Sequence, residues 1–136
     1  MLMNRIAIIL LSTIAMVAGC HRAAIRRPSA SPTDTACNYY WVLNNGTAEE
    51  ERAFNSKDYF DHFARLSPEL QKALSFENVS KMVTKNHTVT SVDVVKVTFP
   101  SYGASVTVRL HFKDGSTQVY NADLTKEDNV WKTLYD

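Results

Sequence analysis

Apolar residues change their spacing near residue 88, and this change divides the folded part of the chain into two halves. Before residue 88 they recur with the helical repeat in short segments, whereas after it they alternate with polar residues one by one. Residues 38–44 hold the aromatic-rich sequence NYYWVLN, which predicts one or two buried helical turns. The first half therefore predicts three or four short helices.

Capping residues mark where these helices begin. Thr47 and Glu50 have the spacing of a capping box, in which each side chain satisfies the other residue's backbone amide. Ser56 can cap the next helix, and Ser67-Pro68 can start another because proline suits the first helical position. Two of the predicted helices each have an apolar face. The residues of these faces are Tyr59, Phe60, Phe63 and Leu66 in the first, and Phe76, Val79, Met82 and Val83 in the second.

The second half predicts four strands joined by tight turns. Residues 88–99 form a Val-rich strand, and Asp114-Gly115 is a hairpin signal. One face of the second strand should point into the core, and it holds Ala104, Val106, Val108, Leu110 and Phe112. The remaining predicted elements are a turn at 100–103, a third strand at 117–124, a turn at 125–129 and a fourth strand at 130–135. We expect an α+β fold in which short N-terminal helices pack on a four-stranded antiparallel meander sheet.

The N-terminus has the pattern of an export signal. A short positive segment precedes the apolar run at residues 6–17, which is too short to span a membrane because a span needs about 20 residues. The run ends in Val17-Ala18-Gly19-Cys20, which resembles the bacterial lipobox. This resemblance implies that Cys20 is the lipid attachment site, carrying diacylglycerol and palmitate.

The residues after the lipobox are polar and contain two prolines, which indicates a flexible tether. We therefore expect a lipoprotein signal peptide at residues 1–19, the lipidated cysteine and its tether at 20–36, and a single α+β domain at 37–136. Residue 21 is His rather than Asp, and by resemblance to enterobacterial lipoproteins this implies the outer membrane, facing the periplasm.

Length, charge and cysteine content limit the number of domains, the kinds of partner and the possible disulfides. A chain of 136 residues has room for one domain, and its net charge of +1 argues against a nucleic-acid-binding surface. If Cys20 carries lipid, Cys37 remains as a lone thiol, and no intramolecular disulfide can form. We expect Cys37 to be a small buried side chain, the alternative being a redox or intermolecular-disulfide role.

Two segments carry a family resemblance. The hairpin FKDGSTQVY at residues 112–120 and the closing segment EDNVWKTL at 127–134 resemble the nuclear-transport-factor-two-like (SnoaL-like, or NTF2-like) cone fold. The resemblance implies a curved sheet with a pocket, in which enzymes of the family use an Asp-His pair as acid and base. The chain lacks the family's usual strand between helices, so a cystatin-like helix-on-sheet layer is the alternative.

Residues with catalytic chemistry are few. Asp58 and His62, with Asp61 between them, are neighbours on a helix, but we expect them to form a solvated helix face rather than a catalytic pair. His111 lies beside Arg109 on the polar face of its strand. The histidines lack metal-ligand spacing, and no phosphate loop or nucleophile motif is present. We expect no catalytic residue, no metal and no cofactor, and hence no enzyme.

Three functions remain after these exclusions. The first, which we expect, is an envelope lipoprotein that binds another protein, in secretion or conjugation, in exclusion or immunity, or in envelope maintenance. The second is a binder of a small apolar ligand in a helix-sheet pocket, and the third is a SnoaL-like enzyme. The candidate ligand or partner contacts are Tyr40, Trp41, Arg109 and His111. The sequence leaves the oligomeric state open.

We predict that Cys20→Ser abolishes membrane association and leaves the domain folded, because the lipid would be attached through that sulfur. Membrane fractionation and circular dichroism measure the two effects. The lipobox assignment is wrong if the cleaved variant still sediments with membranes.

Overall fold

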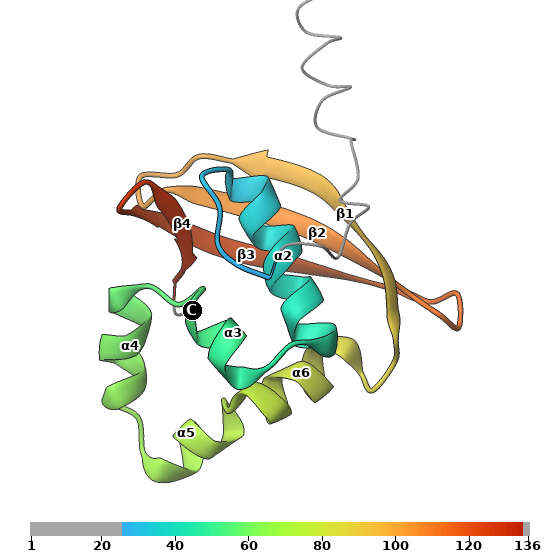
Figure 1. Ribbon diagram of the computed structural model, residues 1–136, viewed down its shortest axis with the longest axis horizontal. Coiled ribbons are helices and arrows are strands. Elements are labelled where there is room, and N and C mark those ends of the chain that lie inside the picture. Colours follow the sequence, from blue (N-terminus) through green and yellow to red (C-terminus); the bar gives the residue numbers. More distant parts are fainter. Residues whose placement is uncertain (1–25, 135–136) are drawn as a thin grey trace, which may run out of the picture.

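The structure, a computed structural model, describes residues 26–134. The helices of this part precede its strands, as Figure 1 shows. The helices are α2 (Pro32–Asn45), α3 (Ala48–Arg52), α4 (Lys57–Ala64), α5 (Pro68–Ala73) and α6 (Phe76–Thr84). The strands are β1 (Val89–Thr98), β2 (Ala104–Phe112), β3 (Thr117–Glu127) and β4 (Val130–Thr133).

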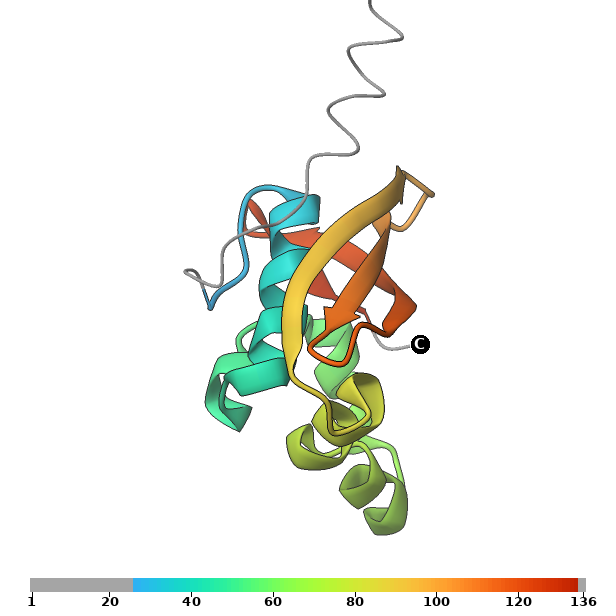
Figure 2. The same cartoon turned by 90° about the vertical axis from the view of Figure 1, so that its right-hand side faces the viewer.

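The four strands form one antiparallel sheet in the order β1-β2-β3-β4. This meander with helices on one face confirms the α+β prediction. Helix α2 crosses the sheet, and α3 to α6 gather near one end of it (Figure 1). Seen from the side, the sheet is curved and twisted, with α2 along its inner face (Figure 2).

The predicted alternation of β2 is confirmed. Its inward residues, from Ala104 to Phe112, are at most 3% exposed, and they form the centre of the hydrophobic core. Helix α2 covers them with Ala36, Tyr40 and Leu43. Three of the outward positions of β2 pair with polar residues of β3, such as Thr107 opposite Asn121, and Arg109 pairs with Val119.

The folded part begins earlier than we expected. Residues 26–36 were predicted to belong to the tether, but α2 begins at Pro32, with Ser31 as its N-cap. The segment before it is held by β4, because the backbone amide and the indole of Trp131 donate to Ser29 and Ala30. Serine and proline, which indicated a linker by composition, here act as a helix cap and a first helical residue.

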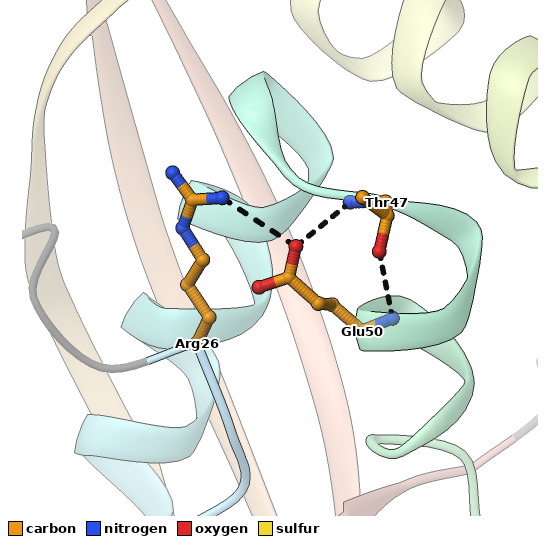
Figure 3. Close-up of polar contacts among 3 residues, drawn as sticks. All are labelled: Arg26, Thr47 and Glu50. Atoms are coloured by element: carbon orange, nitrogen blue, oxygen red, sulfur yellow. Dashed lines mark hydrogen bonds and ion pairs between the residues drawn. The ribbon is translucent and has the colours of Figure 1, made fainter.

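The predicted caps are present. Thr47 and Glu50 form the capping box of α3, and Ser56 and Ser67 cap α4 and α5. Arg26 also lies 3.4 Å from the Glu50 carboxylate (Figure 3). The capping box therefore joins the start of the described chain to the helical half.

The last two strands differ from the prediction. Strand β3 continues to Glu127, whereas we expected a turn from residue 125, and β4 ends at Thr133 rather than Tyr135. The turn contains only Asp128 and Asn129, with φ of 50° and 67°. Both residue types tolerate this left-handed conformation, so a two-residue hairpin closes here despite the polar sequence before it.

Where we expected the strand of the NTF2-like fold to be missing between helices, the structure has an isolated β-bridge. Asn55 pairs in parallel with Thr133 between α3 and α4. The Thr133 amide donates to Phe54 at 2.7 Å, and the Ser56 amide donates to Thr133 at 3.0 Å. This bridge joins the helical half to the sheet edge. Within residues 26–134, no helix is both long enough and apolar enough to cross a membrane.

The register of β2 predicts opposite effects of two neighbouring substitutions. Val108→Asp should lower the free energy of unfolding by about 4 kcal/mol or more, because it buries a charge in the core. Thr107→Asp should cost about 0.5 kcal/mol, because this side chain points outward. Urea denaturation of the two variants measures the difference, and equal midpoints would contradict the register.

Candidate ligand pocket between helices and sheet

A pocket of about 260 Å³ lies between the helices and the end of β4. We call it the tyrosine pocket, because four tyrosines line it. It is open at the sheet edge, because the short β4 pairs with β3 only at residues 124–127. The stretch of β3 from Tyr120 to Asp123 therefore meets the pocket. The lining residues are Tyr39, Tyr40, Tyr59, Met82, Val83, Tyr120, Asn121, Ala122, Asp123, Thr133 and Leu134.

The tyrosines are fixed by packing on one another. Tyr40 of α2 stacks on Tyr120 of β3 with ring centroids 5.9 Å apart and an interplanar angle of 20°. Tyr39 meets Tyr40 edge-on at 5.3 Å. The Tyr120 hydroxyl donates to the Val83 carbonyl at 2.7 Å, near the end of α6. Three elements are thus tied together at the wall of the pocket.

Two of the tyrosines that line the pocket have a raised pKa. Burial raises the pKa of Tyr39 well above 10.0, and the nearby carboxylate of Glu51 raises it further. Burial also raises the pKa of Tyr120. Since both phenols stay protonated near neutral pH, they act as hydrogen-bond donors and apolar surfaces rather than as bases or nucleophiles.

Polar side chains of β3 also line the pocket. The Asp123 carboxylate accepts from the Tyr102 hydroxyl at 2.5 Å, and the Asn121 side chain donates to Ser105 at 2.7 Å. No histidine is among the described residues that line the pocket. The arrangement is suited to holding a small molecule with an apolar body and a hydrogen-bonding group.

The four candidate contact residues lie in three different places. Tyr40 lines the pocket. Trp41 is 8% exposed in the core, and its indole nitrogen has no hydrogen-bond partner among the described residues. Arg109 and His111 lie on the outer face of the sheet, where His111 Nε2 is 2.6 Å from Asp93. The structure thus places only one of the four at the pocket.

The other predicted pair lies on a helix surface. The His62 ring nitrogen is 3.4 Å from the Asp58 carboxylate on α4, and both side chains are about half exposed. This is the i, i+4 contact expected from the spacing, and it lies outside the tyrosine pocket. Within residues 26–134, no three His, Cys, Asp or Glu side chains are grouped as metal ligands.

Cys20, the candidate lipid site, lies outside the described residues. Cys37 is 2% exposed in α2, as expected for a small buried side chain. It is disulfide-bonded, however, so the expectation that it stays a lone thiol is wrong for this structure. No other cysteine lies within residues 26–134.

Sequence reasoning missed most of the pocket. It treated Tyr39 as part of a generic aromatic core, and it did not single out Tyr120 or Asp123. One signal was available, because Tyr120 stands at an inward strand position where its hydroxyl needs a buried partner. The carbonyl that accepts from this hydroxyl belongs to Val83 of α6, and the spacing of residues along the sequence does not predict that pairing.

Comparisons with known proteins support the fold. The family described as "Domain of unknown function (DUF4878)" matches residues 27–134. A crystal structure of a protein from Campylobacter jejuni, named "Putative NTF2-like transpeptidase", is 19% identical, with a TM-score of 0.59. The match covers 78% of this chain and 99% of that one. No curated protein matches the chain. The likeness shows an NTF2-like fold, which was the resemblance inferred from the hairpin and closing segments.

We predict that replacing His62 and His111 together by alanine leaves biological activity unchanged. Neither side chain lines the pocket, and the two lie on different faces of the molecule. The test is to complement a strain lacking the gene with the double variant at wild-type protein level. Loss of activity with an intact fold would point instead to catalysis by Asp58 and His62.

Proposed function

Because the chain belongs to the DUF4878 family and has an NTF2-like fold, we propose that it binds a small, largely apolar ligand in the tyrosine pocket. In this proposal Cys20 anchors the domain by a lipid to the cell envelope, at the outer membrane and facing the periplasm. The tyrosine pocket carries the proposal, since four tyrosines from the helices and the sheet line one cavity of about 260 Å³.

The size and chemistry of the pocket define the ligand class. A volume of about 260 Å³ is at the lower end for ligand pockets, which fits a single ring or a short branched chain. The Tyr40 and Tyr120 rings offer apolar faces, whereas Asn121 and Asp123 offer polar groups at the rim. An uncharged molecule with one hydroxyl or amide group could contact both the apolar rings and the polar groups.

Binding explains the pocket better than catalysis does. The name of the Campylobacter jejuni protein refers to transpeptidation, which requires an activated nucleophile. The Thr133 hydroxyl, which lines the pocket, is buried and is within hydrogen-bond distance of Phe54 and Asn55, with no base beside it. The neutral tyrosines support binding without covalent chemistry.

Cys37 is disulfide-bonded in the structure, whereas the proposed lipid is attached to Cys20. In the Cys20→Ser experiment, the matched control is therefore Cys37→Ser, which should stay with the membrane.

Protein binding is a second candidate, favoured by the turn between β1 and β2. Phe99 is 69% exposed and Tyr102 is 44% exposed in this short turn. Large exposed aromatic residues are frequent anchors of interfaces. The envelope partner would then dock at this turn rather than at the pocket.

We expect Ala122→Leu to weaken the binding of phenol, used as a probe, by at least roughly tenfold. Ala122 is 7% exposed and lines the pocket, so a larger side chain fills the space that the ligand needs. Isothermal titration of the full chain in detergent, with a micelle-only titration as reference, measures the affinity.

The matched control is Val119→Leu, on the outer face of the same strand and 50% exposed. It should bind phenol like the wild type. Equal binding by both variants would contradict the pocket as the site. If Ala122→Leu also kept full biological activity, and Phe99→Ser with Tyr102→Ser lost it, protein binding would replace ligand binding as the function.

A further inference from the structure

A second pocket of about 250 Å³ lies within the helical half, away from the sheet. We call it the helical pocket. Tyr59 of α4 lines it and also lines the tyrosine pocket, so this ring separates the two. The other lining residues are Ala48, Glu51, Arg52, Asn55, Phe60, Phe63, Leu74, Ser75 and Phe76.

Aromatic rings form most of the wall. Tyr59 and Phe63 lie parallel on α4, with centroids 6.2 Å apart and an interplanar angle of 12°. Phe60 stands edge-on to Tyr59 at 6.1 Å and is 41% exposed, which places it at the rim. Phe76 contributes from the start of α6. Aromatic faces grouped around a small volume attract organic cations through their quadrupoles.

One carboxylate lies in this aromatic wall. Glu51 is half-buried near the end of α3, and within residues 26–134 it forms no ion pair within 4 Å. Burial raises the pKa of Glu51, whereas the Asn55 amide and the Arg52 charge lower it by smaller amounts. The group is therefore a partly desolvated negative charge, which a bound cation would stabilise.

The charged and titratable groups around Glu51 lie on α3 and on the neighbouring helices. Arg52 follows it on α3 and is exposed, so water screens its guanidinium. Tyr39 of α2 is near enough for the Glu51 carboxylate to raise the pKa of its phenol. Arg52 is thus the single competing positive charge among the described residues that line the pocket.

We propose that the helical pocket binds a small organic ammonium ion, with Glu51 as its counter-ion and Tyr59, Phe63 and Phe76 as its aromatic cage. Charge complementarity and ring placement define this class, and the volume fits a methylated ammonium group. The inference goes beyond the proposed ligand of the tyrosine pocket, and it does not depend on that ligand.

The experiment titrates the full chain in detergent with tetramethylammonium chloride, and isothermal titration calorimetry measures the affinity. tert-Butyl alcohol, of similar shape but uncharged, serves as the neutral probe. We expect Glu51→Gln and Phe63→Leu each to weaken tetramethylammonium binding by roughly tenfold. Arg52→Gln should strengthen it, because a competing positive charge is removed.

The matched control is Glu49→Gln, an exposed carboxylate on the same helix that does not line the pocket, and it should bind like the wild type. Affinity should be full above the raised pKa of Glu51 and fall as the pH drops through it, because the protonated carboxyl has no charge to offer.

Equal binding by Glu51→Gln and the wild type would overturn the proposal, as would equal binding of the charged and neutral probes or no binding at all. Ala122→Leu separates the two sites, since it should reduce phenol binding and leave tetramethylammonium binding unchanged. A variant that bound neither phenol nor tetramethylammonium would have lost its fold, which circular dichroism detects. In that case the Arg52→Gln variant tests the proposal, because unfolding cannot raise the affinity for tetramethylammonium.

Discussion

The bridge between Thr133 and residues 54–56 is the contact on which both pockets depend. The Thr133 backbone accepts from Ser56 and donates to Phe54, and its hydroxyl is 2.9 Å from the Asn55 side chain. Two outer bonds reinforce it, because Lys132 donates to Ala53 and the Lys57 amide donates to Glu127. These bonds fix the junction of α3 and α4 at the sheet edge.

This junction sets the two pockets on either side of Tyr59. On one side Tyr40 of α2 stacks on Tyr120 of β3, and β4 pairs with β3 only at residues 124–127. On the other side α3 presents Glu51 to the rings of α4. The backbone bridge therefore contributes to both pockets, because Thr133 lines the tyrosine pocket and Asn55 lines the helical pocket.

The sequence predicted the parts of the fold that local patterns determine. The alternation of β2, the capping box at Thr47 and the hairpin at Asp114-Gly115 each depend on residues close in the chain, and the structure contains all three. The early start of α2 was missed because a Ser-Pro sequence can cap a helix or form a linker. The bridge at Thr133 and the Tyr120 contact to α6 join residues 37 or more positions apart, and no local pattern encodes such pairs.

The central claim is that the tyrosine pocket is a ligand site and the outer face of the sheet is not. Backbone amide shifts of the full chain in detergent, followed residue by residue during a phenol titration, test this most directly. The account predicts saturable shifts at Tyr40, Tyr120 and Ala122, with Arg109 and His111 unchanged. Shifts confined to the turn at Phe99, or no saturable shift, would contradict it.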